Sequence, residues 1–244
     1  ELPAPRLVFW DLSRRARLAG ADGPARPFVT VETWIEGTPH ALLSDAAAAR
    51  EAALGVAVLL ARFHAVRRCR WGRPAAGRAR SFVSYTMLGV RRMLRRLESR
   101  GWLGAPQARG ALAAFADWKE TIGRIGTFNL VHNDANRRNF VLTPAGEVMP
   151  VDLHRLAYEP FQEELVNVLY HFCRKEEGLA PAFLETYFAR AGDEARDAHS
   201  SMVGFFKPLH YLKKMYRRAA RPLAAPDEKM DRGGRIVLSV EPPR

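Results

Sequence analysis

The sequence has few cysteines and no long apolar run. Its two cysteines, Cys69 and Cys173, are too few for a disulfide framework and lack the spacing of a metal site, which favours a reducing compartment. The nearest approach to a membrane span, Ala52–Ala61, falls well short of the ~20 apolar residues that a spanning helix needs. Apolar residues still make up 48% of the 244 residues, so the composition is that of a globular protein that buries a core.

Acidic residues are scarce relative to basic ones. The chain has 26 Asp and Glu against 38 Lys and Arg, a formal net charge of +12, and its pI is near 10.4. Such a charge attracts nucleic acid, an anionic membrane or a phosphorylated glycolipid, although an arginine-rich solvated surface gives the same count. No Lys/Arg block is interleaved with aromatic residues as a nucleic-acid platform would be, so no nucleic-acid partner is expected.

The most informative stretch runs from Leu130 to His154. It holds His132, Asp134 and Asn139 in the spacing H-x-D-x-x-x-x-N, followed by two short apolar runs that flank a Pro/Gly turn. This pattern predicts a loop and then a β-hairpin, because a turn between two apolar runs returns the chain on itself. The two runs are Phe140–Leu142 and Val148–Val151, and the second is followed directly by Asp152.

The hairpin is expected to bring Asp134, Asn139 and Asp152 together. One carboxylate is then free to receive a substrate proton, while an amide and a second carboxylate offer the oxygen ligands that Mg²⁺ prefers. Phosphoryl transfer from Mg-ATP needs this combination, because the reacting groups must be held in line and the phosphate charge must be neutralised. The sequence therefore predicts an enzyme that uses ATP and Mg²⁺.

These residues resemble the catalytic loop and metal-binding Asp of the protein-kinase-like superfamily. The likeness is closer to its small-molecule branch, because Asn133 stands where protein kinases have Arg and Asp152 is followed by Leu153 rather than by the Phe-Gly of D-F-G. The string VDLHR at residues 151–155 is similar to the Kdo and heptose kinases of the lipopolysaccharide inner core. Aminoglycoside and choline phosphotransferases are the second likeness.

The resemblance implies a role for each residue of the motif. Asp134 would orient the acceptor hydroxyl and accept its proton, and His132 would brace the loop through a hydrogen bond. Asn139 and Asp152 would hold Mg²⁺ and, with it, the phosphates of the nucleotide. Arg155 is a weaker candidate for contact with an anionic group on the acceptor.

A nucleotide-binding hinge is expected further upstream. Residues 28–35 (FVTVETWI) alternate and are rich in β-branched and aromatic side chains, which predicts a strand. The family reads adenine with main-chain groups at this point, which would be the carbonyl of Thr33 and the amide of Ile35. The family's Gly-rich loop and strand lysine have no counterpart, since the first lysine is Lys119. We therefore expect the C-terminal portion of a longer protein, with a nucleotide-binding pseudokinase scaffold as the alternative.

The same motif admits a different chemistry. His132, Asp134, Asp152 and His154 form an H-x-D…D-x-H set, and His with carboxylate can hold zinc or iron in a metallohydrolase. That interpretation gives no role to Asn139 or to the hinge-like segment.

Hydrophobic periodicity and capping residues predict a mainly helical remainder. A basic connector is expected over Arg67–Arg80, and an extended tail from Arg221 with a short strand at Arg235–Val240. The first expected helix has Ser44 or Asp45 as its N-cap and runs to about Val66. The other expected helices are Ser81–Arg100, Pro106–Ile125, Phe161–Phe172, Pro181–Arg190 and Ser201–Ala220.

Together these features predict an α+β, protein-kinase-like two-lobed fold with an incomplete small-lobe sheet. The expected organisation is a remnant nucleotide-binding lobe and hinge at 1–37, a helical lobe with the catalytic hairpin at 38–220, and a tail at 221–244. The expected function is ATP- and Mg-dependent phosphorylation of a hydroxyl on a lipopolysaccharide core sugar or similar glycolipid, or else of an aminoglycoside- or choline-like molecule. A cytoplasmic enzyme that approaches the anionic inner face of the membrane fits the glycolipid acceptor.

Overall fold

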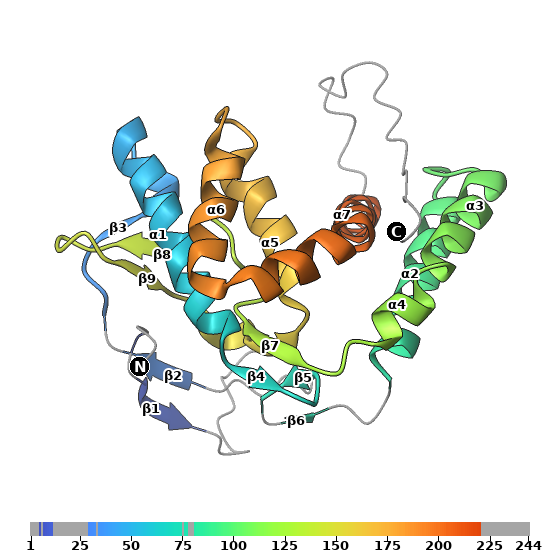
Figure 1. Ribbon diagram of the computed structural model, residues 1–244, viewed down its shortest axis with the longest axis horizontal. Coiled ribbons are helices and arrows are strands. Elements are labelled where there is room, and N and C mark those ends of the chain that lie inside the picture. The colour runs from blue at the N-terminus through green and yellow to red at the C-terminus, as the bar shows by residue number, and fades with distance from the viewer. Residues whose placement is uncertain are drawn as a thin grey trace, which may run out of the picture.

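The computed structural model describes residues 34–74 and 81–220 in full, together with residue 5 and the backbone of residues 7–11, 29–32 and 76–77. It is a mixed structure of helices and small sheets in which helices predominate, which confirms the predicted α+β class. Figure 1 shows helices α1, α5 and α6 on one side, α2, α3 and α4 on the other, and α7 reaching from the first group toward the second.

The N-terminal strands β1 (Leu7–Asp11) and β2 (Val29–Glu32) pair antiparallel. Strand β2 confirms the strand expected within 28–35. The predicted hinge residue Thr33 lies outside the described residues, whereas Ile35 is half-buried and belongs to no strand. The adenine-binding role of these two residues therefore stays a prediction.

A three-stranded sheet contains the predicted hairpin. Its order is β3-β8-β9, with strands β3 (Thr38–Pro39), β8 (Phe140–Leu142) and β9 (Val148–Pro150). Phe140 pairs with Pro150 and Leu142 with Val148, so the two ends of the hairpin lie side by side as expected. Gly146 makes the turn at a φ of +79°, in the left-handed region that glycine adopts without steric cost.

A five-stranded antiparallel sheet supports the loop that precedes the hairpin. Its order is β4-β7-β10-β5-β6, so β7 (Phe128–Val131) lies inside the sheet between β4 and β10. The prediction of a connector over residues 67–80 was wrong in part, because two-residue strands are too short to show alternation in a sequence. The other strands are β4 (Arg67–Arg68), β5 (Gly72–Arg73), β6 (Ala76–Gly77) and β10 (Ala157–Glu159).

The helices enclose two hydrophobic clusters. The first lies among α1 (Ala46–His64), α5 (Phe161–Val168) and α6 (Leu179–Ala191), and it includes Ala135 and Phe140 of the predicted catalytic stretch. The second lies among α2 (Phe82–Ser99), α3 (Ala105–Ala116), α4 (Lys119–Gly123) and α7 (Asp193–Ala220). Val166 of α5 packs into the second cluster, so α5 joins the two.

The predicted helices lie where they were expected, with four corrections to their bounds. The first helix ends at His64, which leaves Val66 outside it and 38% exposed. The single helix expected over 106–125 is two, because α3 stops at Ala116 and α4 starts at Lys119. The helix of α5 continues as the π-helical turn η3 (Leu169–Cys173), and α7 begins eight residues earlier than expected. Two 3₁₀ turns, η1 (His40–Leu42) and η2 (Leu153–Arg155), complete the described elements.

The expected tail beyond Ala220 lies outside the described residues. Among the helices that are described, none has the length and apolar character to cross a bilayer.

The contact between α1 and the hairpin can be tested at Gly55. A Cβ added there would lie 2.7 Å from Cγ2 of Val148 on β9, whereas a Cβ at the exposed Gly110 of α3 meets nothing within 4 Å. Replacing Gly by Ala inside a helix normally adds ~0.5–1 kcal/mol of stability. We expect that gain for Gly110→Ala and none for Gly55→Ala, measured by denaturant unfolding. Equal gains for the two variants would contradict the close packing of α1 on β9.

Candidate active site

Strand β7 delivers the loop that carries His132 and Asp134. His132 is fully buried, whereas Asp134 is partly exposed. Between them, Asn133 has a φ of +63°. This left-handed conformation is uncommon for residues other than glycine, and asparagine is among the few that tolerate it. The chain therefore turns sharply at the point where it leaves the sheet.

A buried carboxylate from α5 holds this turn. Glu164 accepts hydrogen bonds from the backbone N–H of His132 (3.0 Å) and of Asn133 (2.7 Å). Its Oε2 also lies 3.0 Å from Nε2 of His64, whose Nδ1 is 2.8 Å from the hydroxyl of Tyr187. The chain Tyr187–His64–Glu164 thus anchors the loop to the first hydrophobic cluster, and His64 has a structural role in it.

Glu164 is held as an anion. Burial by itself raises the pKa of this carboxyl, but the hydrogen bond and charge of His64, the charge of His132 and the amide of Asn133 outweigh it, so the pKa lies below its ordinary value of 4.5. An ionised carboxylate can accept several hydrogen bonds at once, and here it satisfies two backbone donors that burial would otherwise leave unpaired.

The loop and the hairpin form one hydrogen-bonded unit. Nε2 of His132 lies 2.9 Å from the carbonyl oxygen of Val151, a bracing contact of the kind expected from the sequence. The backbone N–H of Val151 donates to the carbonyl of Asn139 at 2.9 Å. These two bonds fix the far end of the hairpin against both ends of the H-x-D-x-x-x-x-N segment.

The predicted site residues Asp134, Asn139 and Asp152 all belong to this unit. The buried amide of Asn139 donates from Nδ2 to the backbone carbonyl of Asp134 at 2.8 Å, which leaves its Oδ1 available as an oxygen ligand. Asp152 directly follows Val151, has a φ of +60°, and its half-exposed carboxylate contacts Nδ1 of His154. An amide oxygen and a carboxylate are suitable ligands for Mg²⁺, so the residues present fit that ion.

Two donors orient the carboxylate of Asp134. Nδ2 of Asn136 donates to Oδ1 at 3.2 Å, and Nη1 of Arg155 lies 3.4 Å from Oδ2. The structure therefore places Arg155, the weaker candidate from the sequence, directly beside the expected base.

The loop is also braced from α5 and from η1. Nδ2 of Asn167 donates to the carbonyl of Ala135 at 3.0 Å, and the N–H of Ala41 donates to the carbonyl of Arg137 at 3.0 Å. Nε of Arg137 donates to Nδ1 of His40 at 2.9 Å. Burial and the charge of Arg137 together lower the pKa of His40, consistent with a neutral ring that accepts this bond.

The metallohydrolase interpretation finds no support. Within the residues that the structure describes, no group of three or more His, Cys, Asp or Glu side chains is placed to hold a metal ion. Nε2 of His132 faces a backbone carbonyl, and Nδ1 of His154 contacts Asp152. The H-x-D…D-x-H spacing therefore does not produce a shared coordination site.

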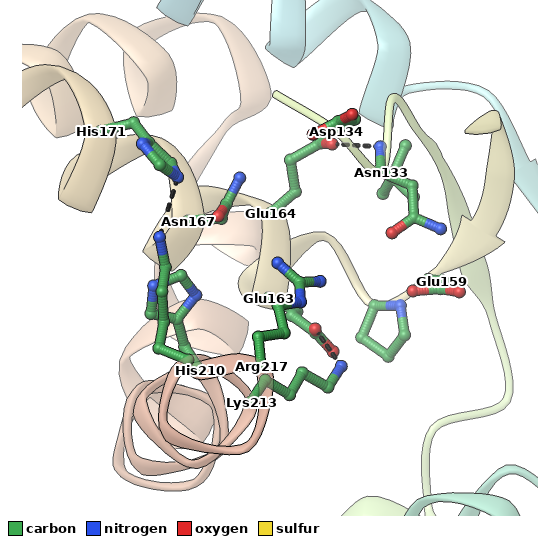
Figure 2. Close-up of a pocket in the computed structure, with 13 residues that line it drawn as sticks. Asn133, Asp134, Glu159, Glu163, Glu164, Asn167, His171, His210, Lys213 and Arg217 are labelled. Atoms are coloured by element: carbon green, nitrogen blue, oxygen red, sulfur yellow. Dashed lines mark hydrogen bonds and ion pairs between the residues drawn. The ribbon is translucent and has the colours of Figure 1, made fainter. Parts of the chain in front are cut away.

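A pocket opens beside Asp134, between α5 with η3 on one side and α7 on the other (Figure 2). Asp134 and Asn133 line one end of it. The helical walls are rich in charged and polar groups, namely Glu163, Glu164, Asn167 and His171 from one side and His210, Lys213, Lys214 and Arg217 from α7.

Sequence reasoning missed Glu164 and the basic pocket wall. In the sequence, Glu164 is one of two acidic residues at a helix start, and the available signal is its position on the face of Phe161 and Val168, both of which are buried. The residues of α7 read as a basic amphipathic helix packed on the large lobe. Only the tertiary structure places that helix next to Asp134.

Comparisons with known proteins give the family and the fold. The sequence profile described as phosphotransferase enzyme family matches residues 1–201. A search among curated proteins found no match.

Among solved structures, 59 chains match. One is an aminoglycoside phosphotransferase from Streptomyces rimosus ATCC10970 in complex with ADP and streptomycin, at 20% identity and a TM-score of 0.53, covering 88% of this chain and 76% of that one. An ADP-bound aminoglycoside phosphotransferase of type APH(2'')-Ib has 12% identity and a TM-score of 0.58, with 91% and 70% covered. An aminoglycoside-3'-phosphotransferase of type VIII has 19% identity and a TM-score of 0.52, with 88% and 74% covered.

These matches confirm the second of the two likenesses named from the sequence, and with it the kinase-like fold. At such identities the solved structures show the fold alone, and the likeness to lipopolysaccharide kinases stays a prediction.

The anchoring role of Glu164 predicts a large loss of stability in Glu164→Gln. The neutral amide keeps the size of the side chain but puts an NH₂ group against donors, so we expect a loss of ~2–4 kcal/mol in unfolding free energy. The same change at Glu120, which is exposed and pairs with Arg124 of its own helical segment, should cost less than ~1 kcal/mol. A Glu164→Gln variant as stable as Glu120→Gln would contradict the anchor.

The difference between wild type and Glu164→Gln should depend on pH. Because the folded-state pKa of Glu164 is lowered, its contribution to stability is full above the unfolded pKa near 4.5 and is lost as pH falls below that value. Unfolding curves from pH 7 to pH 3 should therefore converge at the acidic end. A difference that stays constant over this range would show that the charge of Glu164 is not what stabilises the loop.

Proposed function

The chain belongs to the phosphotransferase enzyme family, and from this premise we propose that it transfers the γ-phosphoryl group of ATP to a hydroxyl group of a sugar-like small molecule. Family membership confirms the expected class of enzyme, a kinase with an alcohol group as acceptor. The identity of the acceptor and the roles of individual residues belong to the proposal.

One observation carries the proposal. Asp134, Asn139 and Asp152 come from a loop and a hairpin that hydrogen bonds fasten together, as the bonds from Asn139 to Asp134 and from Val151 to Asn139 record. A carboxylate base next to two oxygen ligands is what in-line phosphoryl transfer requires of a protein.

In the proposed reaction the acceptor hydroxyl oxygen attacks the γ-phosphorus, the bond to the β–γ bridging oxygen breaks, and ADP leaves. Asp134 orients the hydroxyl and receives its proton. Asn136 and Arg155 keep the carboxylate in one orientation by the contacts described above. A Mg²⁺ ion held by Asn139 and Asp152 would neutralise the phosphate charge, and His132 acts by holding the hairpin in register.

The nucleotide would enter from the N-terminal side. We assign residues 1–37 to the remnant nucleotide-binding lobe and hinge, residues 38–220 to the helical lobe, and residues 221–244 to a tail. Thr33 and Ile35 would contact adenine through main-chain groups. The names of the similar structures record ADP or GDP, which supports a nucleoside triphosphate as donor.

Two acceptor classes remain candidates. Aminoglycosides are named with several of the similar structures, which favours an aminoglycoside-like acceptor. A lipopolysaccharide core sugar or similar glycolipid is the acceptor expected from the VDLHR string, and it would place the enzyme in the cytoplasm at the inner face of the membrane. A pseudokinase scaffold is the third interpretation, which a measurement of turnover decides.

Asp134→Asn should slow turnover strongly without weakening the binding of the nucleotide. Removing the base is expected to lower the rate of phosphoryl transfer by ~10²–10⁴-fold, because an amide cannot take the hydroxyl proton. ADP release measured with a panel of hydroxyl acceptors gives the rate, and fluorescence titration gives ATP affinity, which should not change. The matched control Asp117→Asn, at the exposed C-terminal end of α3, should behave as wild type. Equal rates in the two variants would remove Asp134 from the reaction.

Asn139→Ala should weaken divalent metal binding. Loss of an oxygen ligand is expected to raise the Mg²⁺ concentration needed for half-maximal rate by at least ~10-fold, and to weaken Mn²⁺ binding in the presence of ADP to a similar degree. Asn139→Asp keeps an oxygen ligand and should retain the metal while losing the bond to the Asp134 carbonyl. Unchanged Mn²⁺ affinity in Asn139→Ala, measured by electron paramagnetic resonance, would refute this ligand assignment.

A further inference from the structure

We propose that the acceptor carries an anionic group, a phosphate or a carboxylate, which binds against α7 at Lys214 and Arg217 in the pocket beside Asp134. This inference rests on the proposed function, since it assigns the pocket to the acceptor of the phosphoryl group. It names the chemical class of that acceptor from the charges that surround the expected base.

The carboxylates of the pocket already have partners. Glu164 is engaged by His64 and by two backbone amides, and Glu163 forms an ion pair with Lys213. Glu159 also has an interaction partner. Asp134 is the base, with Arg155 beside it. The acidic side chains of the pocket therefore offer little free negative charge to a cationic substrate.

Lys214 and Arg217 of α7 differ from these carboxylates, because no group of opposite charge among the described residues pairs with them. Nζ of Lys214 donates to Nε2 of His171 at 3.1 Å and lies 4.1 Å from the centroid of the Tyr170 ring, and both partners are uncharged. Arg217 is exposed. Within the part of the chain that the structure describes, no carboxylate forms an ion pair with Lys214 or Arg217. Figure 2 shows the side chains of Arg217 and Lys213 extending from α7 toward α5.

Further cations lie close to Lys214. Burial lowers the pKa of Lys214, and the charges of Arg217, Arg174 and Arg218 lower it further. Several cations thus repel one another at one wall of the pocket. A bound anion would relieve this repulsion, because it would be the counter-charge that the fold does not supply.

A buried histidine gives an independent observation. His210 lines the same pocket and is 5% exposed, yet its Nε2 has no hydrogen-bond partner among the residues that the structure describes. Burial, followed by the charges of Lys214 and other neighbours, lowers the pKa of His210 to about 3 and that of His171 to about 4, so both rings are neutral at pH 7. A neutral imidazole can donate one N–H to an anion. A buried polar atom without a partner calls for an explanation, and a bound ion or water is one of them.

A polycationic acceptor suits this pocket poorly. Aminoglycosides carry several protonated amino groups, which would lie near Lys214 and Arg217 instead of near free carboxylates. The chain therefore shares the fold of aminoglycoside phosphotransferases, while one wall of its own pocket carries cations that would repel such an acceptor. This difference separates the two acceptor classes left open above and favours a phosphorylated or carboxylated sugar.

The test compares acceptors that differ in charge. Binding of glucose 6-phosphate, glucuronate, glucose and kanamycin, and of a phosphorylated glycolipid in detergent micelles, is measured by calorimetry with Mg²⁺ and a non-hydrolysable ATP analogue, and phosphoryl transfer is measured with ATP. We expect the anionic acceptors to bind at least ~10-fold tighter than glucose, since paired charges and their hydrogen bonds exceed neutral ones. Tight binding of the glycolipid alone would identify a lipid-linked source of the anion, and binding of the free sugars a soluble one.

Charge reversal on α7 provides the second half of the test. Arg217→Glu and Lys214→Glu should weaken binding of the anionic acceptors by at least ~10-fold and leave the KM for ATP unchanged. Lys207→Glu makes the same charge change at an exposed position of α7 away from the pocket, and it should have no effect. Melting temperatures check that each variant folds.

The outcomes separate the inference from the proposed function. Preferential binding or phosphorylation of kanamycin, or anionic acceptors that bind no better than glucose, overturns the anionic-acceptor inference and leaves a phosphotransferase. Binding of anionic sugars that requires Lys214 and Arg217, without any transfer, supports the pocket assignment and refutes the proposed catalysis. Equal effects of Lys207→Glu and Arg217→Glu would also overturn the inference, because they would reduce it to general surface charge.

Discussion

The buried carboxylate of Glu164 is the interaction on which the rest of the site depends. It accepts two backbone N–H groups where the chain turns at Asn133, and it is held by His64 from α1. A buried charge is tolerated only when its hydrogen-bonding capacity is satisfied, so the loop, α1 and α5 must be in place together. The position of Asp134 therefore follows from contacts made by residues that take no part in the chemistry.

The hairpin extends that constraint to the expected metal ligands. Bonds between His132 and Val151 and between Val151 and Asn139 tie its end to the loop, and α1 closes over β9 at Gly55. Because both strands of a hairpin end at the same edge, fixing one end fixes the other. The site is thus built on a rigid unit, which suits a reaction that depends on alignment more than on covalent chemistry.

The shared fold and the charged wall of the pocket beside Asp134 come from different parts of the chain. The likeness to aminoglycoside phosphotransferases lies in the arrangement of helices and sheets, whereas the wall of the pocket opposite Asp134 belongs to α7, whose last eight residues include Lys213, Lys214, Arg217 and Arg218. A common scaffold can serve acceptors of opposite charge if one helix changes its surface residues. Among the described residues, Nε2 of His210 lacks a hydrogen-bond partner and Lys214 and Arg217 lack a carboxylate partner, and the proposed anionic acceptor rests on these three groups.

The sequence by itself determined the motif, the hairpin and the main helices, because spacing, turn residues and periodicity are local properties. It did not reveal Glu164 or the cluster of Lys214, Arg217 and His210, since contacts such as those of Glu164, with residues 31 to 100 positions away, leave no local pattern. The strands within 67–77 and the break at 117–118 were missed for the same reason: both depend on packing against other elements rather than on propensity. The motif therefore lies in a short segment of the sequence, but its anchor Glu164 and the charged wall of the pocket beside Asp134 form only when α5 and α7 come together next to that segment, because they depend on contacts between distant residues.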